Sequence, residues 1–226
     1  MPDDRSPFTN LRAGEAFLVS PPGGGDGPGV LVLHSWWGLT PFFRELCDRL
    51  AEAGYSALAP DLFGGEIPAT PDEGQAALAA LNANRATALV LSSARALRAA
   101  SADPSAPVGV LGFSMGASFA LWLSARSPLE VSAVVAFYGT QNIDFADARC
   151  AYLGHFAEFD EFVSDDDVVE MKAHLHLVGR EPIFHHYPAT THWFFEADRE
   201  PAYSADAAEL AWQRTLAFLD REVRPG

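Results

Sequence analysis

The chain has 226 residues, and its hydrophobic content of 49% is enough for one compact unit that buries roughly three quarters of the unfolded surface. Its 15 basic and 30 acidic side chains give a formal net charge of −15, spread along the chain, which excludes nucleic acids and anionic membranes as favoured partners. Only two cysteines are present, and no CxxC or HExxH string occurs, so the composition predicts neither a disulfide scaffold nor a metal site. No apolar run approaches the ~20 residues that cross a bilayer, so no membrane span is predicted.

The amino-terminal segment has no features of a signal peptide. Residues 1–5 do not form the basic start that precedes an apolar stretch in such peptides. We therefore expect a cytoplasmic protein. We also expect a single domain over residues 1–226, present as a monomer or small homo-oligomer, and no cofactor.

Apolar runs and helix patterns alternate along the chain. The Gly- and Pro-rich segment 21–29 separates a short apolar run from a second one that ends at His34, residues 30–34, which predicts a hairpin-like start. Thr40–Pro41 is a residue pair typical of helix starts. The expected strands are residues 16–20, 30–34, 55–59, 107–111, 131–137, 150–156 and 182–187. The expected helices are residues 41–54, two between 71 and 100 that are broken near 82–84, 117–126, one capped by Ser164 and one capped by Ser204.

Three consecutive acidic residues, Asp165–Asp167, follow Ser164 and could be taken for metal ligands. Three consecutive positions do not share one face of a helix. Serine is a typical N-cap, and acidic side chains in the first turn favour the positive end of the helix. The segment therefore predicts a capped helix start.

The alternation of buried strands with helices indicates an α/β fold, with a doubly wound, mostly parallel sheet and helices on both faces. Ligand sites in such sheets lie at the carboxyl ends of the strands. The polar residues at or just after the expected strand ends are His34, Asp61, Ser114, Tyr138, Asp160 and His192.

The segment Gly112–Gly116 has the pattern G-x-S-x-G. The pattern alone is a weak signal, but here it lies between an expected strand and an expected helix, which is the setting of a nucleophile elbow. That setting would expose the Oγ atom of Ser114. Because a serine hydroxyl is nearly un-ionised at neutral pH, Ser114 needs a neighbouring base in order to attack a carbonyl group.

Seven histidines could supply that base. Three lie inside expected strands and two on a helix, where packing or solvent exposure is the usual role. His192 follows the last expected strand in a loop, residues 187–192, that could bend back over the sheet, so we expect it to be the base. His34 lies in the segment expected to bind the oxyanion. The five discounted histidines are His155, His174, His176, His185 and His186.

A carboxylate is then needed to orient the imidazole. Asp160 lies 46 residues after Ser114 and 32 before His192, as their numbers show, and the order Ser, Asp, His is the one expected for this fold. Glu158 is close enough in sequence to replace it. Asp144 and Asp165 are further competitors.

The oxyanion should be held by two backbone N–H groups, one from Met115 and one from Trp36 in the loop after the early buried strand. The side chains around these positions are mostly aromatic and predict a compact apolar pocket, although ordinary packing would explain them equally well. The expected pocket residues are Ser35, Trp37, Phe113, Tyr138 and Trp193.

Taken together, these segments resemble the dienelactone hydrolase family, a group within the α/β hydrolases. The similarity covers nearly the whole chain after the first dozen residues. The segments that carry it are residues 30–39, 59–65, 110–116, 137–139, 154–163 and 187–195. The last two resemble the aspartate and histidine motifs of the family, and they favour Asp160 over Glu158.

The chain departs from this family at two positions that are expected to act together. The type member has cysteine in the elbow, where this chain has Ser114, and the family usually has glutamate where this chain has Ser35. In the family, that glutamate is thought to accept the thiol proton. A serine does not ionise spontaneously and needs no such partner, so the resemblance implies a conventional serine esterase without a carboxylate beside the oxyanion.

The expected function is hydrolysis of small esters or lactones through an acyl-enzyme on Ser114. Family members specific for dienelactones bind a substrate carboxylate with arginines, and these have no evident counterpart here; Arg85 could reach the site but is expected to be a surface charge. Glu196 after an apolar run also argues against an anionic lactone. The alternatives are a thioester, a larger ester, or a non-catalytic binding module with this fold.

Overall fold

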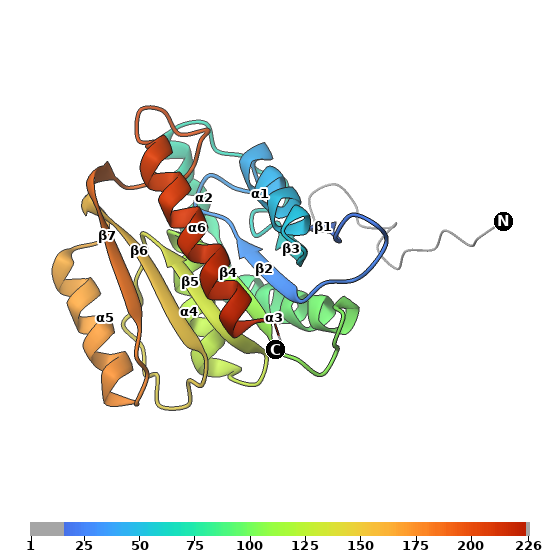
Figure 1. Cartoon of the computed structure of the whole chain (residues 1–226). Coiled ribbons are helices and arrows are strands. Elements are labelled where there is room, and N and C mark those ends of the chain that lie inside the picture. The colour runs from blue at the N-terminus through green and yellow to red at the C-terminus, as the bar shows by residue number, and fades with distance from the viewer. Residues whose placement is uncertain (1–15, 225–226) are drawn as a thin grey trace.

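The computed structural model describes residues 16–224, and a seven-stranded sheet in the order β1-β3-β2-β4-β5-β6-β7 forms its centre (Figure 1). Strands β2 to β7 run parallel to their neighbours, and β1 runs antiparallel to β3. The strands are β1 Ala16–Val19, β2 Gly29–Leu33, β3 Ser56–Pro60, β4 Val108–Phe113, β5 Val131–Phe137, β6 Ala151–Phe159 and β7 Ile183–Thr191. The expected α/β fold with a mostly parallel sheet is confirmed.

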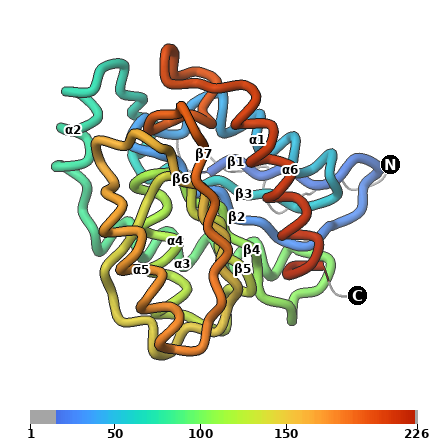
Figure 2. Tube along the Cα trace, turned by 60° about the vertical axis from the view of Figure 1, so that its left-hand side comes forward, coloured from blue at the N-terminus to red at the C-terminus, as the bar shows by residue number. Residues whose placement is uncertain are grey.

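Helices cover both faces of this sheet. Helices α1 and α6 lie on one face and α3, α4 and α5 on the other (Figure 1), and Figure 2 shows α5 and α6 on opposite sides of β7. The helices are α1 Pro41–Glu52, α2 Pro71–Ala80, α3 Ala83–Ala100, α4 Met115–Arg126, α5 Asp165–Leu177 and α6 Ala205–Glu222. None of these helices is long and apolar enough to cross a membrane.

The two faces of the sheet carry two separate hydrophobic clusters. On one face, Phe43 and Leu46 of α1 and Trp212 of α6 pack against the strands. On the other face, Val90 of α3 and Met171 of α5 do the same. Strands β2, β3 and β4 are buried at every position, and apart from Ser56 they contain no polar side chain, as expected for strands covered on both sides.

Three helix starts have the side-chain capping bonds expected for such residues, whereas Thr40 at α1 and Ser204 at α6 stand at the N-cap without a side-chain capping bond. The Thr70 and Asn82 side chains accept hydrogen bonds from backbone N–H groups at the starts of α2 and α3. Ser164 and Asp167 form a reciprocal capping box at the start of α5, which confirms the prediction for the acidic segment. Within residues 16–224, no cluster of three or more His, Cys, Asp or Glu side chains could hold a metal ion.

The beginning of the chain differs from the expected hairpin. Strand β1 pairs with β3, whereas β2 lies on the other side of β3 and pairs with β4. The segment between β1 and β2 is nine residues long, with Gly23 and Gly24 at positive φ, and is not a tight turn. The expected hairpin was therefore wrong.

The two strands at the far edge are longer than expected. Strand β6 continues to Phe159 and β7 to Thr191, and these two residues are paired after an irregularity beyond Ala157. A positive φ of 56° at Ala189 accommodates this irregularity. As a result, Asp160 and His192 each follow directly after a strand, and the loop expected at residues 187–192 is mostly strand.

Candidate active site

Ser114 lies at the sharp turn between β4 and α4. Its backbone has φ 52° and ψ −113°, which is strained for a residue with a side chain. The two glycines of the pattern are required for packing, because a Cβ atom on Gly112 would overlap the Gly116 carbonyl oxygen, and one on Gly116 would overlap that of Leu33. The turn therefore has the geometry of a nucleophile elbow.

Three side chains from the carboxyl ends of β4, β6 and β7 meet in a hydrogen-bonded row. The Ser114 Oγ atom lies 2.8 Å from His192 Nε2, and His192 Nδ1 lies 2.8 Å from both carboxylate oxygens of Asp160. The side chains of His192 and Asp160 are 3% and 5% exposed. With Nδ1–H donating to the carboxylate, Nε2 is free to accept the serine proton.

Asp160 is fixed by its own loop. Its Oδ1 atom accepts hydrogen bonds from the backbone N–H groups of Phe162 at 2.9 Å and Val163 at 3.0 Å. The exposed Glu158 instead accepts a hydrogen bond from Ala189 N–H. The other two competitors contact neither His192 nor Ser114: Asp144 accepts from Ala146 N–H, and Asp165 is the first residue of α5.

The discounted histidines lie where expected. His155, His185 and His186 are inside strands, and His174 and His176 are on α5. His34 has a supporting position: its Nε2 accepts a hydrogen bond from Leu62 N–H at 3.0 Å, which places the proton on Nδ1, 2.7 Å from the Ser35 carbonyl oxygen. Burial lowers the pKa of His34 and keeps it neutral.

The two expected oxyanion donors are both without an intramolecular acceptor. Met115 is the first residue of α4, so its N–H has no helical partner and lies at the positive end of the helix. In the part of the chain that the structure describes, neither Met115 N–H nor Trp36 N–H makes a hydrogen bond. Both groups are therefore available to a ligand.

Aromatic rings surround His192. Trp36 stacks on Trp193 with ring centroids 5.5 Å apart, Trp37 contacts both, and Phe162 lies 4.8 Å from the imidazole. A cavity of about 840 Å³ adjoins this cluster. Its lining includes Trp37, His192, Trp193, Glu161, Asp198, Arg199 and Glu200.

Three of the five expected pocket residues do not line an open pocket. Ser35, Phe113 and Tyr138 have no exposed surface. Phe113 stacks on Phe137 at 4.5 Å within the core, because its position on β4 turns its ring toward the α1 and α6 face. Only Trp37 and Trp193 line the cavity beside His192.

Glu196 was expected as an acidic residue near the site, but its burial and its hydrogen-bond partners were not expected. It has no exposed surface, and its two oxygens accept hydrogen bonds from Ser35 Oγ and Tyr138 OH, each at 2.8 Å. Ser35 itself brings no carboxylate to this region, but Glu196 supplies a carboxyl group from another loop. The signal in the sequence was an acidic residue directly after the apolar residues Trp193–Phe195.

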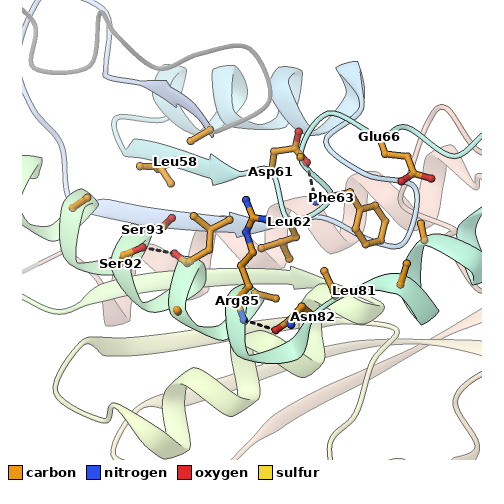
Figure 3. Close-up of a pocket in the computed structure, with 18 residues that line it drawn as sticks. Leu58, Asp61, Leu62, Phe63, Glu66, Leu81, Asn82, Arg85, Ser92 and Ser93 are labelled. Atoms are coloured by element: carbon orange, nitrogen blue, oxygen red, sulfur yellow. Dashed lines mark hydrogen bonds between the residues drawn. The ribbon is translucent and has the colours of Figure 1, made fainter.

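A second and larger cavity, about 920 Å³, lies elsewhere, between α2, α3 and the loop after β3. Arg85 extends into it in Figure 3, while Asp61 is held by the backbone N–H groups of Phe63 and Gly65. Ser114, His192 and Asp160 do not line this cavity. Arg85 is exposed and belongs to this second cavity, not to the site around Ser114.

Known proteins similar to this chain identify its family. Residues 15–223 match the model of the dienelactone hydrolase family. The chain is 33% identical to the protein usf of Aquifex pyrophilus, over 90% of this chain and 91% of that protein, and 29% identical to the carboxymethylenebutenolidase of Rhodococcus opacus, over 89% and 84%. It also resembles the crystal structure of a Klebsiella pneumoniae protein assigned as a dienelactone hydrolase, with a TM-score of 0.81, 25% identity and coverage of 91% and 92%.

Proposed function

Because the chain belongs to the dienelactone hydrolase family and is thus a hydrolase that acts on esters, we propose that it cleaves small esters or lactones through an acyl-enzyme on Ser114. The observation that carries this proposal is the unbroken row from Ser114 Oγ through His192 to Asp160, with both hydrogen-bonded steps at 2.8 Å. The proposal includes serine in place of the cysteine of the type member, in a single domain over residues 1–226.

In the first half-reaction, Ser114 Oγ bonds to the carbonyl carbon of the substrate while its proton passes to His192 Nε2. The negative charge on the carbonyl oxygen is held by Met115 N–H and Trp36 N–H. The tetrahedral intermediate then collapses, the bond to the leaving oxygen breaks, and His192 gives that oxygen the proton. Asp160 stabilises the imidazolium during these steps.

In the second half-reaction, a water molecule attacks the acyl carbon and gives a proton to His192. The Ser114 ester bond breaks, and the proton returns to Ser114 Oγ. The sum is one ester and one water converted to an acid and an alcohol. A lactone substrate yields a single product, a hydroxy acid, because its acid and alcohol groups are in one molecule. The name of the Rhodococcus relative supports lactones as substrates.

The charges beside the triad favour uncharged substrates. The cavity at His192 is lined by the acidic residues Glu161, Asp198 and Glu200. Its one lining arginine, Arg199, pairs with Asp198 at 3.1 Å and stacks on Trp37 at 4.4 Å. Ser114, Met115 and Trp36 do not line this cavity, so only the part of a substrate that extends past His192 would enter it. A carboxylate on that part would meet repulsion and an arginine that already has partners.

Covalent labelling tests the nucleophile. A fluorophosphonate probe should modify wild-type protein at one serine, and peptide mass spectrometry should locate the adduct on Ser114. The variant Ser114→Ala should stay unlabelled, while the control Ser92→Ala, which changes an exposed serine on α3, should be labelled as wild type. Folded wild-type protein that is not labelled, or is labelled at another serine, would refute the proposal.

A further inference from the structure

The buried Glu196 has no part in the chemistry proposed above. Its backbone lies in the turn after β7, where its N–H donates to the Trp193 carbonyl oxygen at 2.9 Å. Its side chain has no exposed surface. Fully buried acidic side chains are rare in proteins and require specific partners, so this position calls for an explanation.

The carboxyl group connects three separate segments of the site. Ser35 precedes Trp36, the expected oxyanion donor of the loop after β2. Tyr138 follows β5 with a positive φ of 37°, and its ring lies 4.9 Å from the His192 imidazole. Glu196 itself follows His192 by four residues. Two hydrogen bonds thus fix the oxyanion loop relative to the histidine.

Few charges act on this carboxyl group. Burial raises the pKa of Glu196 to about 8, and the negative charge of Asp198 also raises it. The hydrogen bonds from Tyr138 and Ser35 and the positive charge of Arg199 lower this pKa. The Tyr138 hydroxyl facing it also has a raised pKa, mainly through burial, and Asp160 contributes to this shift. His34, next to Ser35, is neutral. Glu196 is therefore mostly a neutral acid at pH 7, in which one oxygen carries the proton and donates to the hydroxyl group it faces, while the other oxygen accepts.

We propose that Glu196 is a positioning residue for the ester hydrolysis proposed above: its carboxyl group joins Ser35 to Tyr138 and holds the Trp36 N–H in place against Ser114 and His192, and a negative charge on it would lie behind the oxyanion loop. The proposal rests on the proposed function, because it concerns the rate of that reaction. It assigns no contact between Glu196 and the substrate.

Ionisation should slow the reaction for an electrostatic reason. A carboxylate at Glu196 would lie behind the residue that precedes the oxyanion donor, in a buried region where charges interact strongly. It would oppose the negative charge that develops on the substrate oxygen. The positive charge on His192 already has Asp160 as its partner, so the additional carboxylate acts mainly against the oxyanion.

The test is the pH dependence of kcat for hydrolysis of 4-nitrophenyl acetate between pH 5.5 and 9.5. Wild-type kcat should decline on the alkaline side with a midpoint near the pKa of about 8. Glu196→Gln, which keeps a donor and an acceptor but cannot ionise, should lose this decline and keep kcat near neutral pH within about fivefold of wild type. Glu196→Ala should lower kcat by roughly 10- to 100-fold with KM changed less than about threefold, because the oxyanion donor acts in the transition state.

Controls separate the possible outcomes. The exposed Glu45→Gln should have the wild-type profile. If Glu196→Ala does not fold, as judged by circular dichroism, the profile of Glu196→Gln decides. An alkaline decline retained in Glu196→Gln, or wild-type kcat in folded Glu196→Ala, overturns the positioning role. Wild-type protein that neither hydrolyses the ester nor reacts with the fluorophosphonate instead overturns the proposed function itself.

Discussion

Two serines follow neighbouring strands of the sheet and have contrasting surroundings. Ser114 follows β4 in a strained conformation, is partly exposed, and contacts an imidazole. Ser35 follows β2, is fully buried, and donates to the carboxyl group of Glu196. Each hydroxyl has a group beside it that could accept a proton.

The difference between them shows that a neighbouring acceptor is not sufficient for a nucleophile. Ser114 is half-buried, and it precedes Met115, whose N–H has no partner in the described part of the chain. Ser35 has no surface through which a substrate could approach. This contrast supports Ser114 as the proposed nucleophile and Ser35 as part of the support for the oxyanion loop.

The largest expected effect tests this contrast directly. Ser114→Ala should lower kcat for a short activated ester by at least about 10⁴-fold, because the covalent route is lost. Ser35→Ala should lower it by no more than about tenfold, because only support for the oxyanion loop is lost. Steady-state kinetics on both folded variants measure the two values. Similar losses in the two variants would remove the distinction between the serines.

The next effect concerns the acid that orients the histidine. Asp160→Asn should lower kcat by about 10³- to 10⁴-fold, because the amide no longer stabilises the imidazolium or its required tautomer. The matched change Asp165→Asn, at the exposed start of α5, should leave kcat as in the wild type. A wild-type rate in Asp160→Asn would show that another group orients His192.

The smallest effect is on stability and concerns the acid beside Ser35. Since burial raises the pKa of Glu196 to about 8, the folded protein holds a proton there that the unfolded chain loses near pH 4.5. Its contribution to stability is complete below that lower pH and is lost as the pH rises to about 8. The free energy of unfolding of wild type should therefore fall relative to Glu196→Gln between these limits, as urea denaturation at several pH values would measure. A constant difference would mean that Glu196 is not protonated in the folded protein.

The hydrogen-bonded row of a serine, a histidine and an aspartate could be predicted from the ends of the expected strands and from the order of these residues in the chain. Ser114, Asp160 and His192 each follow a strand, and the carboxyl ends of parallel strands meet at one edge of the sheet. Gly112 and Gly116, on either side of Ser114, also indicated a sharp turn at this serine. The choice of Asp160 over Glu158 needed the family resemblance, because two acids two residues apart at a strand end cannot be separated by spacing alone.

The pocket and the buried acid could not be predicted for physical reasons. Phe113 and Tyr138 are adjacent in sequence to strand ends near the site, but the direction of each side chain depends on the packing of α1 and α6 over the sheet. Glu196 follows a turn, where an acidic side chain is usually exposed. Its burial depends on two hydroxyl groups, at Ser35 and Tyr138, that are 161 and 58 residues away in the chain.

The pairing of Phe159 with Thr191 has a consequence for the durability of the enzyme. Strand β7 is the outermost strand of the sheet, and the residue that follows this last pair on each strand is one half of the His192–Asp160 contact. Edge strands open locally at a lower free-energy cost than the whole protein unfolds. Fraying of β7 would therefore separate the histidine from its acid while the rest of the sheet stays intact, so that loss of activity on warming would report on the pairing of β7 with β6 and not on global unfolding.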